Sequence, residues 1–399
     1  MEIDHPTLYV EINDTNYIFV ANIYDENQNL KVVEKIIAPS AGIDKSKFIS
    51  IDQAAEEIKK NVAIIEKKLN YIFQDVTVLI DNFDYSCINI SGFKKLNGSQ
   101  VLKENISYIL NSLKLAVTEN EKQKTILHIF NSNSILDGIR IDNLPIGLFG
   151  DFYSHELTFF LIRNNDLKNI QKMFNKNNLN IKKVILKNFG EGVQLINRNK
   201  DTETFFKIKI AEDISQINFF DNSSFRYSEN FNFGTNIIFR DIEKICSLDN
   251  KIIRRFLSNS FLNKKNFNDN EILEEDYFTK GNFRKIRKKL ISDIADARIN
   301  EITHIIFNKN INIESLKGNK IKIYLIIKDK QILENFKESF KSYFSQNNNF
   351  EIYLINDFEI DESIMSVANL SIYGWKKEAI PTIKLKNSLI TRIFKSLFG

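Results

Sequence analysis

The residues that could carry out chemistry in this chain are not spaced as a catalytic or metal-binding motif. The four histidines, His5, His128, His155 and His304, lie far apart and are expected to be structural or exposed. The Ser, Cys and His residues form no recognisable nucleophile motif, and no Rossmann or Walker glycine motif occurs. The chemistry that the sequence favours is therefore binding, through apolar and charged side chains.

The clearest binding pattern lies in residues 386–399. On a helical wheel, one face of this segment is apolar and the other is basic and polar. Asn387 or Ser388 can cap the helix, and no acidic residue follows Glu378. A short cationic amphipathic helix is typical of a membrane-surface anchor, although a last helix can also dock on its own domain. The expected membrane-binding residues are Leu389, Ile390, Arg392, Ile393, Phe394, Lys395, Leu397 and Phe398.

The magnitudes of the forces predict how such an anchor works. A helix of about ten residues is marginal alone in water, so it should fold as it binds. Basic side chains near anionic lipid add about 1 kcal/mol each, and this segment offers Lys384, Lys386, Arg392 and Lys395. One copy should bind reversibly and several linked copies tightly. The tail therefore predicts a protein that self-associates on an anionic membrane surface.

A second charged cluster lies in residues 284–289. It contains Arg284, Lys285, Arg287 and Lys288. The simplest interpretation is a solvated helix face, and the functional alternative is a contact for a neighbouring subunit or a partner protein.

Composition indicates a foldable globular chain. A chain of 399 residues is too long for one compact core. Of these residues 43% are hydrophobic, and only 4 are Pro. A formal net charge of +4 with scattered basic residues does not favour a nucleic-acid partner. Cys87 and Cys246 fit a reducing cytosol, the first residues are not a signal peptide, and no apolar run has transmembrane length. We expect a cytoplasmic protein that touches a membrane only through its tail.

The same strand–turn–strand unit is predicted near the start of each half. In the first half, residues 8–12, 17–23 and 31–37 are predicted strands, with a polar loop at residues 13–16. In the second half, residues 204–210, 216–220 and 225–227 are predicted strands, with a loop at residues 211–215. Such hairpins are common, so the repetition is weak evidence for two related halves.

Helices and buried strands follow each unit. Ser50 and Gln53 form a capping box before a helix whose buried stripe is Ala54, Ile58, Val62, Ile65 and Leu69. Residues 76–80 and 321–327 are predicted strands. A second long helix is expected to bury Phe283, Ile286, Leu290, Ile294 and Ala297, and a further one contains Leu333, Phe336, Phe340 and Phe344.

Alternating strands and helices in both halves predict an α/β fold with two mixed sheets. The first domain is expected at residues 1–83 and 161–190, with an inserted α+β subdomain at 84–160. The second domain is expected at 191–240 and 283–373, with an inserted helical subdomain at 241–282. A linker at 374–386, after strand-like sequence and marked by Gly374 and Pro381, would lead to the helix at 387–399.

The order of elements resembles the bacterial cell-division protein FtsA family of the actin-like superfamily. Residues 39–54 look like the family's segment between its first hairpin and first helix. Residues 144–150 (LPIGLFG) look like the Pro-Ile-Gly-Met segment that closes its inserted subdomain, and residues 290–302 are similar to the helix that re-enters its second domain. The resemblance implies an actin-like fold with two large domains, each carrying an inserted subdomain, and a membrane-targeting C-terminal helix.

The phosphate-binding glycines of that superfamily are replaced in this chain. The first loop, Asp-Ile-Gly-Thr-Ser-Lys, corresponds to residues 11–16, and the second, Asp-Ile-Gly-Gly-Gly-Thr-Thr-Asp, to residues 209–216. The adenosine loop, Thr-Gly-Gly-Gly, corresponds to residues 326–329. Backbone amides can approach a phosphate closely only where glycine leaves room. The remnants of the site are Glu11, Asn13, Asp14, Thr15, Asn16, Lys209, Glu212, Asp213, Ser215, Gln216, Lys328 and Asp329.

The resemblance implies an adaptor that tethers the tubulin-like division protein FtsZ to the cytoplasmic face of the inner membrane at the division site. The resemblance implies ATP and Mg²⁺ as ligands, but because the glycine turns are replaced we expect neither ATP hydrolysis nor tight nucleotide binding. Thr15 and Ser215 keep hydroxyls for a weak or altered ligand. One alternative is an active ATPase or kinase of the superfamily with differently aligned loops. Another is a pilus-assembly scaffold of the related fold, which needs no lipid-binding helix.

Overall fold

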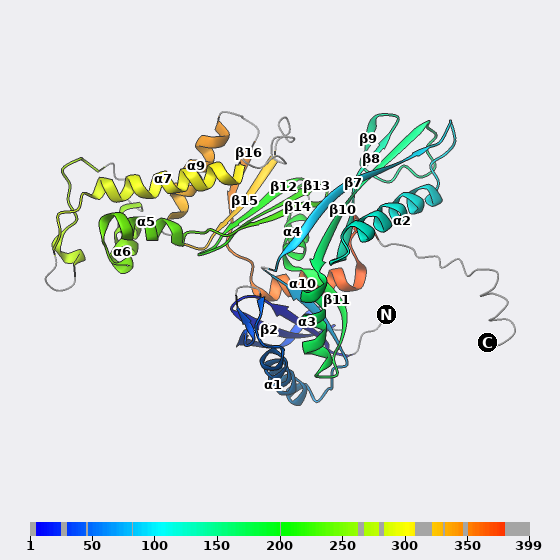
Figure 1. Cartoon of the computed structure of the whole chain (residues 1–399), viewed down its shortest axis with the longest axis horizontal. Helices are drawn as coiled ribbons and strands as arrows, with labels where there is room; N and C mark the ends of the chain where they lie inside the picture. Colours follow the sequence, from blue (N-terminus) through cyan, green and yellow to red (C-terminus); the bar gives the residue numbers. More distant parts are fainter. Residues whose placement is uncertain are drawn as a thin grey trace.

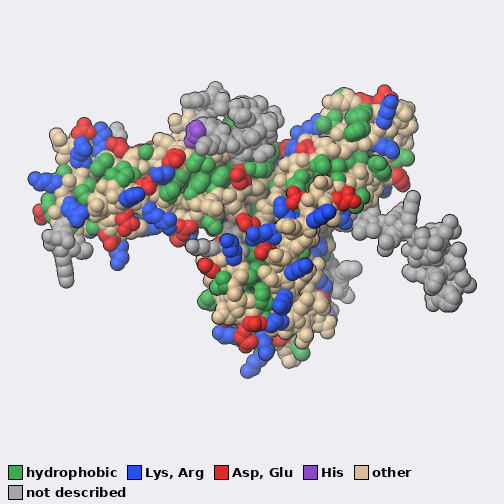
Figure 2. All heavy atoms as spheres, in the orientation of Figure 1, with side chains coloured by type: hydrophobic (Ala, Val, Ile, Leu, Met, Phe, Trp, Pro, Cys, Tyr) green, Lys and Arg blue, Asp and Glu red, His purple; other side chains and the backbone are tan. Residues whose placement is uncertain are grey.

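Figure 1 presents a computed structural model of the chain, in which a first lobe, an inserted sheet and a second lobe spread from a common centre. The structure describes residues 5–24, 30–44, 47–81, 83–199, 201–261, 267–278, 283–307, 321–329, 332–345 and 350–379. On the face shown in Figure 2, acidic and basic side chains are interspersed. This mixture agrees with the modest formal charge of +4.

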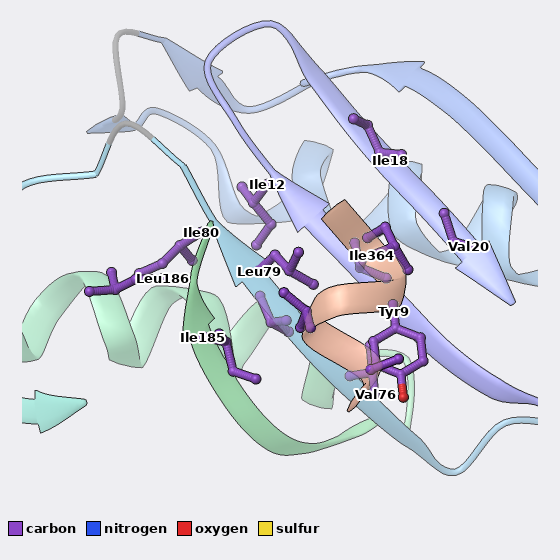
Figure 3. Close-up of a cluster of buried hydrophobic side chains, with 14 of the residues drawn as sticks. Tyr9, Ile12, Ile18, Val20, Val76, Leu79, Ile80, Ile185, Leu186 and Ile364 are labelled. Carbon is purple, nitrogen blue, oxygen red and sulfur yellow. The ribbon is translucent and has the colours of Figure 1, made fainter. Parts of the chain in front are cut away.

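The first lobe is a five-stranded mixed sheet in the order β11-β6-β1-β2-β3. Strands β1 (Thr7–Ile12), β2 (Asn16–Tyr24) and β3 (Leu30–Pro39) are antiparallel, whereas β6 (Asp75–Ile80) and β11 (Asn180–Leu186) run parallel to β1. Helices α1 (Ile51–Leu69) and α3 (Asn164–Asn175) pack on each other, and β4 (Ile43–Asp44) pairs with β5 (Lys47–Phe48). Figure 3 shows apolar side chains of β1, β2, β6 and β11 meeting in the core.

The second lobe repeats this strand connectivity, and its sheet has the order β14-β13-β12-β15-β16. Strands β12 (Phe205–Ile210), β13 (Ser215–Asp221) and β14 (Ser224–Phe231) are antiparallel. Strands β15 (Ile321–Ile327) and β16 (Phe350–Leu354) run parallel to β12. Because both sheets join a three-stranded meander to two parallel strands in the same order, the topology supports two related halves.

Helices extend the second lobe away from the inserted sheet (Figure 1). They are α5 (Asn236–Cys246), α6 (Asn250–Phe261), the short η1 (Glu275–Tyr277), α7 (Lys288–Phe307) and α9 (Leu333–Ser345). Helix α7 packs between α5 and α9, and α5 also contacts α6. Their apolar faces share a core with β12 and β15.

The inserted sheet has the order β7-β10-β8-β9 and is antiparallel throughout. Its strands are β7 (Tyr85–Lys95), β8 (Lys124–Leu136), β9 (Ile139–Ile141) and β10 (Phe152–Arg163), and α2 (Lys103–Asn120) covers one face. The sheet also contacts β14, where Phe160 stacks on Phe225 with ring centroids 4.3 Å apart. The insert is therefore joined to both lobes.

Two helices lie between the lobes: α4 (Lys187–Arg198) and α10 (Ile360–Tyr373). Glycines in α4 permit the close packing. A Cβ at Gly190 would lie 2.6 Å from Cγ2 of Val367 in α10, and a Cβ at Gly192 would lie 1.9 Å from the Phe220 ring in β13. The core of the first lobe consequently continues into the second.

The segment after α10 forms a strap, residues 375–379. The Trp375 indole N–H donates to the Ser223 carbonyl (2.8 Å), and Lys376 pairs with Glu203 (2.7 Å). The strap then pairs antiparallel with β8, because the Asn131 N–H donates to the carbonyl of residue 377 and the Ala379 N–H to the Ile129 carbonyl. The strap ties the inserted sheet to the second lobe.

Most of the predicted elements are present, with corrections in two places. Ser50 caps α1 by accepting the Gln53 N–H at 3.3 Å, as predicted. The predicted stripe of the long second-half helix is wrong at three of its five positions: Phe283 and Ile286 precede α7, and Ala297 is exposed. Leu290 and Ile294 pack against the second-lobe core, as predicted. The buried positions of α7 are Ile291, Ala295, Ile299, Ile302 and Ile306. The strand-like sequence expected before Gly374 is helix α10, and the predicted linker begins with the strap.

Candidate functional site

The ends of both central sheets face a cavity of about 280 Å³ between the lobes. Its walls include the β1–β2 loop, the β12–β13 loop and the segments that follow β6, β11, β15 and β16. Predicted site residues that line it are Asn13, Asp14, Thr15, Lys209, Glu212, Asp213, Gln216 and Lys328. Ligands of open α/β sheets commonly bind at such carboxyl ends, so this cavity is the candidate site.

The first loop uses its own amide donors. The Asn13 side-chain oxygen accepts the Thr15 N–H at 3.0 Å, the Thr15 hydroxyl at 3.1 Å and the Asn16 N–H at 2.8 Å. This is an Asx-type turn, in which a side chain replaces a backbone or ligand acceptor. Asn13, which the resemblance aligns with a loop glycine, therefore occupies two backbone amides of its own loop.

The second loop is closed in a similar way. The Ala211 N–H donates to the Ile214 carbonyl at 3.0 Å, and Gly234 packs so closely that a Cβ there would lie 2.2 Å from the Ala211 oxygen. Asp213 pairs with Arg240 at 3.2 Å, and Glu212 pairs with Lys328 at 3.3 Å. Both carboxylates are thus held at the cavity, where their negative charge repels an anionic ligand.

Three charged residues that line the cavity were not predicted from the sequence: Asp81, Lys187 and Asp357. Lys187, at the start of α4, lies 2.7 Å from Glu11 and 3.6 Å from Asp81. Burial raises the pKa of Glu11 despite the opposing ammonium of Lys187. Burial also acts on Lys187, but Asp81 and Glu11 outweigh it and raise its pKa. Lys187 therefore serves as the internal counter-ion of two carboxylates.

A second lysine at the cavity is also paired. Lys209 lies 2.8 Å from Asp357, which follows β16. Burial alone would lower the pKa of Lys209, yet Glu191, Asp81 and Asp357 hold it above its ordinary value. The neighbouring Lys207 is fully buried and contacts Glu191 and Asn188 of α4, so this lysine joins β12 of the second lobe to the interlobe helix.

The remaining predicted remnants do not line the cavity. Glu11 is fully buried behind it, and the buried Ser215 donates its hydroxyl to the Phe233 carbonyl at 2.8 Å. The Asn16 side-chain amide donates a hydrogen bond to the Thr15 hydroxyl oxygen. Asp329 pairs with Arg254 at 2.8 Å and also contacts Thr235, so it belongs to the α6 side of the second lobe.

The cavity does not fit a nucleoside triphosphate. Five carboxylates and three lysines line it, and the amides of Thr15, Asn16 and Ala211 donate within their own loops. A phosphate chain would have to displace the ion pairs and meet uncompensated carboxylates in a partly shielded site. Among the described residues, no group of three or more His, Cys, Asp or Glu could hold a metal ion.

A second cavity, of about 350 Å³, lies between the inserted sheet and the first lobe. It is lined by Thr125–His128 of β8, Ile181–Ile185 of β11, Leu167 and Gln171 of α3, and Glu378 of the strap. His128 Nδ1 lies 2.8 Å from the Glu378 carboxylate, and its Nε2 accepts the Leu186 N–H at 3.3 Å. β11 is an edge strand of its sheet, and β8 and β11 form two walls of this groove.

The basic residues of the predicted partner contact do not form a helix face. Arg284, Lys285 and Arg287 are exposed but precede α7, which begins at Lys288. Lys288 is partly buried and pairs with Glu274. The interpretation of this run as a solvated helix face is therefore wrong for Arg284, Lys285 and Arg287.

The predicted membrane helix lies outside the described residues, which end at Ala379. Within the described part of the chain, no helix is long and apolar enough to span a membrane.

Comparison with known proteins identifies the fold. No family model and no curated protein matches the chain. Among solved structures, the PilM-PilN type IV pilus biogenesis complex matches with a TM-score of 0.54 and 11% identity over 94% of this chain and 99% of that one. The ethanolamine utilization protein EutJ from Carboxydothermus hydrogenoformans matches with a TM-score of 0.44 and 7% identity over 93% and 90%. The match to the PilM-PilN complex, together with the two similarly connected five-stranded sheets, shows that the chain has the two-domain actin-like ATPase fold.

Proposed function

We propose that this actin-like chain is an adaptor that works without nucleotide turnover. The observation that carries the proposal is the internal pairing of the interlobe cavity. Asn13 occupies the amides of the first loop, and Lys187 and Lys209 are committed to carboxylates. An actin-like fold that has lost its phosphate contacts can still present surfaces to partners, since a fold is separable from the sites built on it.

The proposed membrane contact is the C-terminal segment. Its six apolar side chains alternate with basic ones at helical spacing, and the acidic residues end at Glu378. Through this segment, self-associated copies would hold a cytoplasmic partner at the inner membrane. The resemblance to the FtsA family makes the tubulin-like division protein FtsZ the proposed partner, at the division site.

Vesicle co-sedimentation of the full chain tests the membrane contact. The double substitution Ile393→Glu with Phe394→Glu should abolish pelleting with anionic vesicles, because it charges the apolar face. The matched control, Thr391→Glu with Ser396→Glu, changes the net charge equally on the polar face and should retain most binding. Equal loss in both variants would reject insertion of the apolar face. Absence of binding by the unsubstituted chain would reject the anchor.

Nucleotide titration tests the proposal that ATP is not used. We expect no micromolar binding of a fluorescent ATP analogue, with or without Mg²⁺, and no phosphate release. The charge substitution Glu212→Gln with Asp213→Asn removes two carboxylates at the cavity, and it should not create tight binding because the loop amides remain occupied. Micromolar binding by the unsubstituted chain would contradict the proposal and favour an active ATPase.

A second candidate function is a pilus-type assembly scaffold. It is favoured by the match to the PilM-PilN complex over nearly the full length of both chains and by the groove between β8 and β11. Such a scaffold would accept an extended cytoplasmic tail of an inner-membrane protein at this groove. Val184→Arg should then block that partner, whereas Lys182→Arg should not. Co-sedimentation with FtsZ polymers that persists in Val184→Arg would favour the division adaptor.

A further inference from the structure

A hollow of about 660 Å³ with basic walls lies where the inserted sheet meets the first lobe. Its cationic side chains come from several elements: Lys47 of β5, Lys122 in the loop before β8, Lys124 at the start of β8, Arg163 at the end of β10 and Lys168 of α3. Asp166 is the one acidic residue among its lining residues. The lining of this hollow is therefore mainly basic, whereas carboxylates outnumber lysines in the interlobe cavity.

Only part of this positive charge is neutralised nearby. Arg163 pairs with Asp166 at 2.7 Å and Asp84 at 3.6 Å, and Lys124 pairs with Glu121 at 2.9 Å. Within the described ranges, Lys47, Lys122 and Lys168 are exposed and form no salt bridge. Three ammonium groups are thus available to an anion from three different elements.

The backbone that carries these groups is held in place. The Asn164 N–H donates to the Gln123 carbonyl at 2.8 Å, and the Asn164 side chain donates to the Lys122 carbonyl at 3.0 Å. The Thr125 hydroxyl donates to the Asn164 side-chain oxygen at 2.6 Å. These bonds fix the loop before β8 to the start of α3. The shape of the hollow is therefore set by hydrogen-bonded backbone as well as by the lysine side chains.

The strap is directed toward the same end of the molecule as the basic hollow. Because the strap is antiparallel to β8, the chain at Ala379 runs from Ile129 toward Lys124. Five strand residues span about 17 Å. Leu389 is the tenth residue after Ala379, and an extended chain of ten residues reaches about 35 Å. The C-terminal segment and the basic hollow can therefore engage one surface together.

We propose that the basic hollow is a phosphate-binding site whose ligands are the phosphates of anionic lipid headgroups. This inference rests on the proposed membrane role for its lipid source. Lysine ammonium groups bind phosphate as point charges, and near an anionic surface they strengthen association with a marked dependence on salt. The hollow would give the body of the molecule a defined orientation on the bilayer, which the C-terminal segment alone would leave free.

The test uses the full chain in which Lys47, Lys122 and Lys168 are all changed to Gln. The control variant changes Lys59, Lys67 and Lys244, which are exposed elsewhere, to Gln, so that both variants lose the same charge. With vesicles of phosphatidylglycerol and phosphatidylcholine, the hollow variant should bind about tenfold more weakly than the control and show a shallower salt dependence. Equal affinity of the two variants would remove the headgroup as the ligand.

A soluble arm separates this site from the C-terminal anchor. Pyrophosphate should raise the thermal unfolding midpoint of the unsubstituted chain and of the control, but not of the hollow variant. If the chain fails to bind vesicles while this difference persists, the proposed membrane role fails and the site binds a free phosphate compound. If neither vesicles nor pyrophosphate distinguish the hollow variant from the control, the phosphate site is overturned.

Discussion

At the scale of single residues, the buried pair of Lys207 and Glu191 connects β12 to α4. Both side chains are almost completely buried, and Lys207 also donates to Asn188 at 2.9 Å. Burial lowers the pKa of Lys207, while the adjacent Glu191 opposes the shift. Such a pair is costly to break, because removal of one partner leaves an uncompensated charge in the interior.

Lys207→Met should therefore lower the free energy of unfolding by about 3–5 kcal/mol. The double variant Lys207→Met with Glu191→Leu should recover most of this loss, since no buried charge remains. Urea unfolding of the three proteins measures the effect, with the exposed Lys59→Met as control. Additive losses in the double variant would mean that the two side chains act independently.

His155 predicts a pH dependence of stability in the inserted sheet. It is fully buried, and neither ring nitrogen has a hydrogen-bond partner among the described residues. Burial lowers its pKa to about 4. Because the unfolded chain binds the proton more readily, stability is complete above about pH 6.5 and falls as the pH drops toward 4, by about 2 kcal/mol at pH 5.

His155→Leu should remove this part of the pH dependence, because it removes the titrating group. The measurement is the unfolding midpoint at pH 7 and pH 5 for the unsubstituted chain, His155→Leu and His5→Leu. His5 is exposed and serves as the control. An unchanged pH slope in His155→Leu would assign the acid sensitivity to other groups.

At the scale of elements, α4 is unusual because its glycines contact other elements. Alanine normally stabilises an exposed helix position by about 1 kcal/mol relative to glycine. At Gly192 the sign should reverse, because a Cβ would lie 1.9 Å from the Phe220 ring. Gly192→Ala should destabilise the chain by about 1–3 kcal/mol in urea unfolding, whereas Ser112→Ala on the exposed face of α2 should not. A more stable Gly192→Ala protein would contradict the packing of α4 on β13.

The strap predicts where the chain can be shortened. A chain that ends at Ala379 should unfold at the temperature of the full chain, because it keeps the contacts to Ser223 and Ile129. A chain that ends at Gly374 should unfold at a lower temperature, since it loses these contacts and the pair of Glu378 with His128. Identical midpoints for the two truncated chains would show that the strap does not stabilise the fold.

At the scale of the whole molecule, the lobes are joined by apolar packing as well as by ion pairs. The rings of Phe160, Phe225, Phe220 and Phe205 stack in series from β10 to β12, with centroids 4.3, 4.7 and 4.9 Å apart. The stack joins the inserted sheet to the second lobe, and the core that α4 and α10 share joins the second lobe to the first. Apolar contacts therefore connect all three parts of the molecule.

Membrane recruitment of the proposed adaptor should depend on copy number. Residues 380–399 fused to a monomeric carrier should bind anionic vesicles weakly, and the same segment on a dimeric carrier at least 100-fold more tightly. Full-length protein should resemble the dimeric fusion at concentrations where it self-associates. The readout is vesicle co-sedimentation over a range of protein concentrations. Full-length binding as weak as that of the monomeric fusion would argue against avidity.

The fold class was predictable from local patterns, and the outcome at particular elements shows why. The period of apolar residues and the Ser50 cap predicted α1, and the alternation around Asn13 predicted β1 and β2. In α7 the prediction began the helix too early, because Phe283 and Ile286 continue a helical spacing although they precede it. Spacing indicates which face is apolar, but not which residues a neighbouring helix covers.

The sequence by itself determined that residues 11–16, 209–216 and 326–329 contain no glycine and that the last segment is cationic and amphipathic, because these are properties of adjacent residues. The charge network of the cavity was decided only by the tertiary structure. Asp81, Lys187 and Asp357 follow three different strands and belong to no local motif, yet the two sheets bring them to one cavity. The basic hollow arises in the same way from β5, β8 and α3. Charges far apart in the chain interact only once the packing of the lobes has removed the distance and much of the water between them.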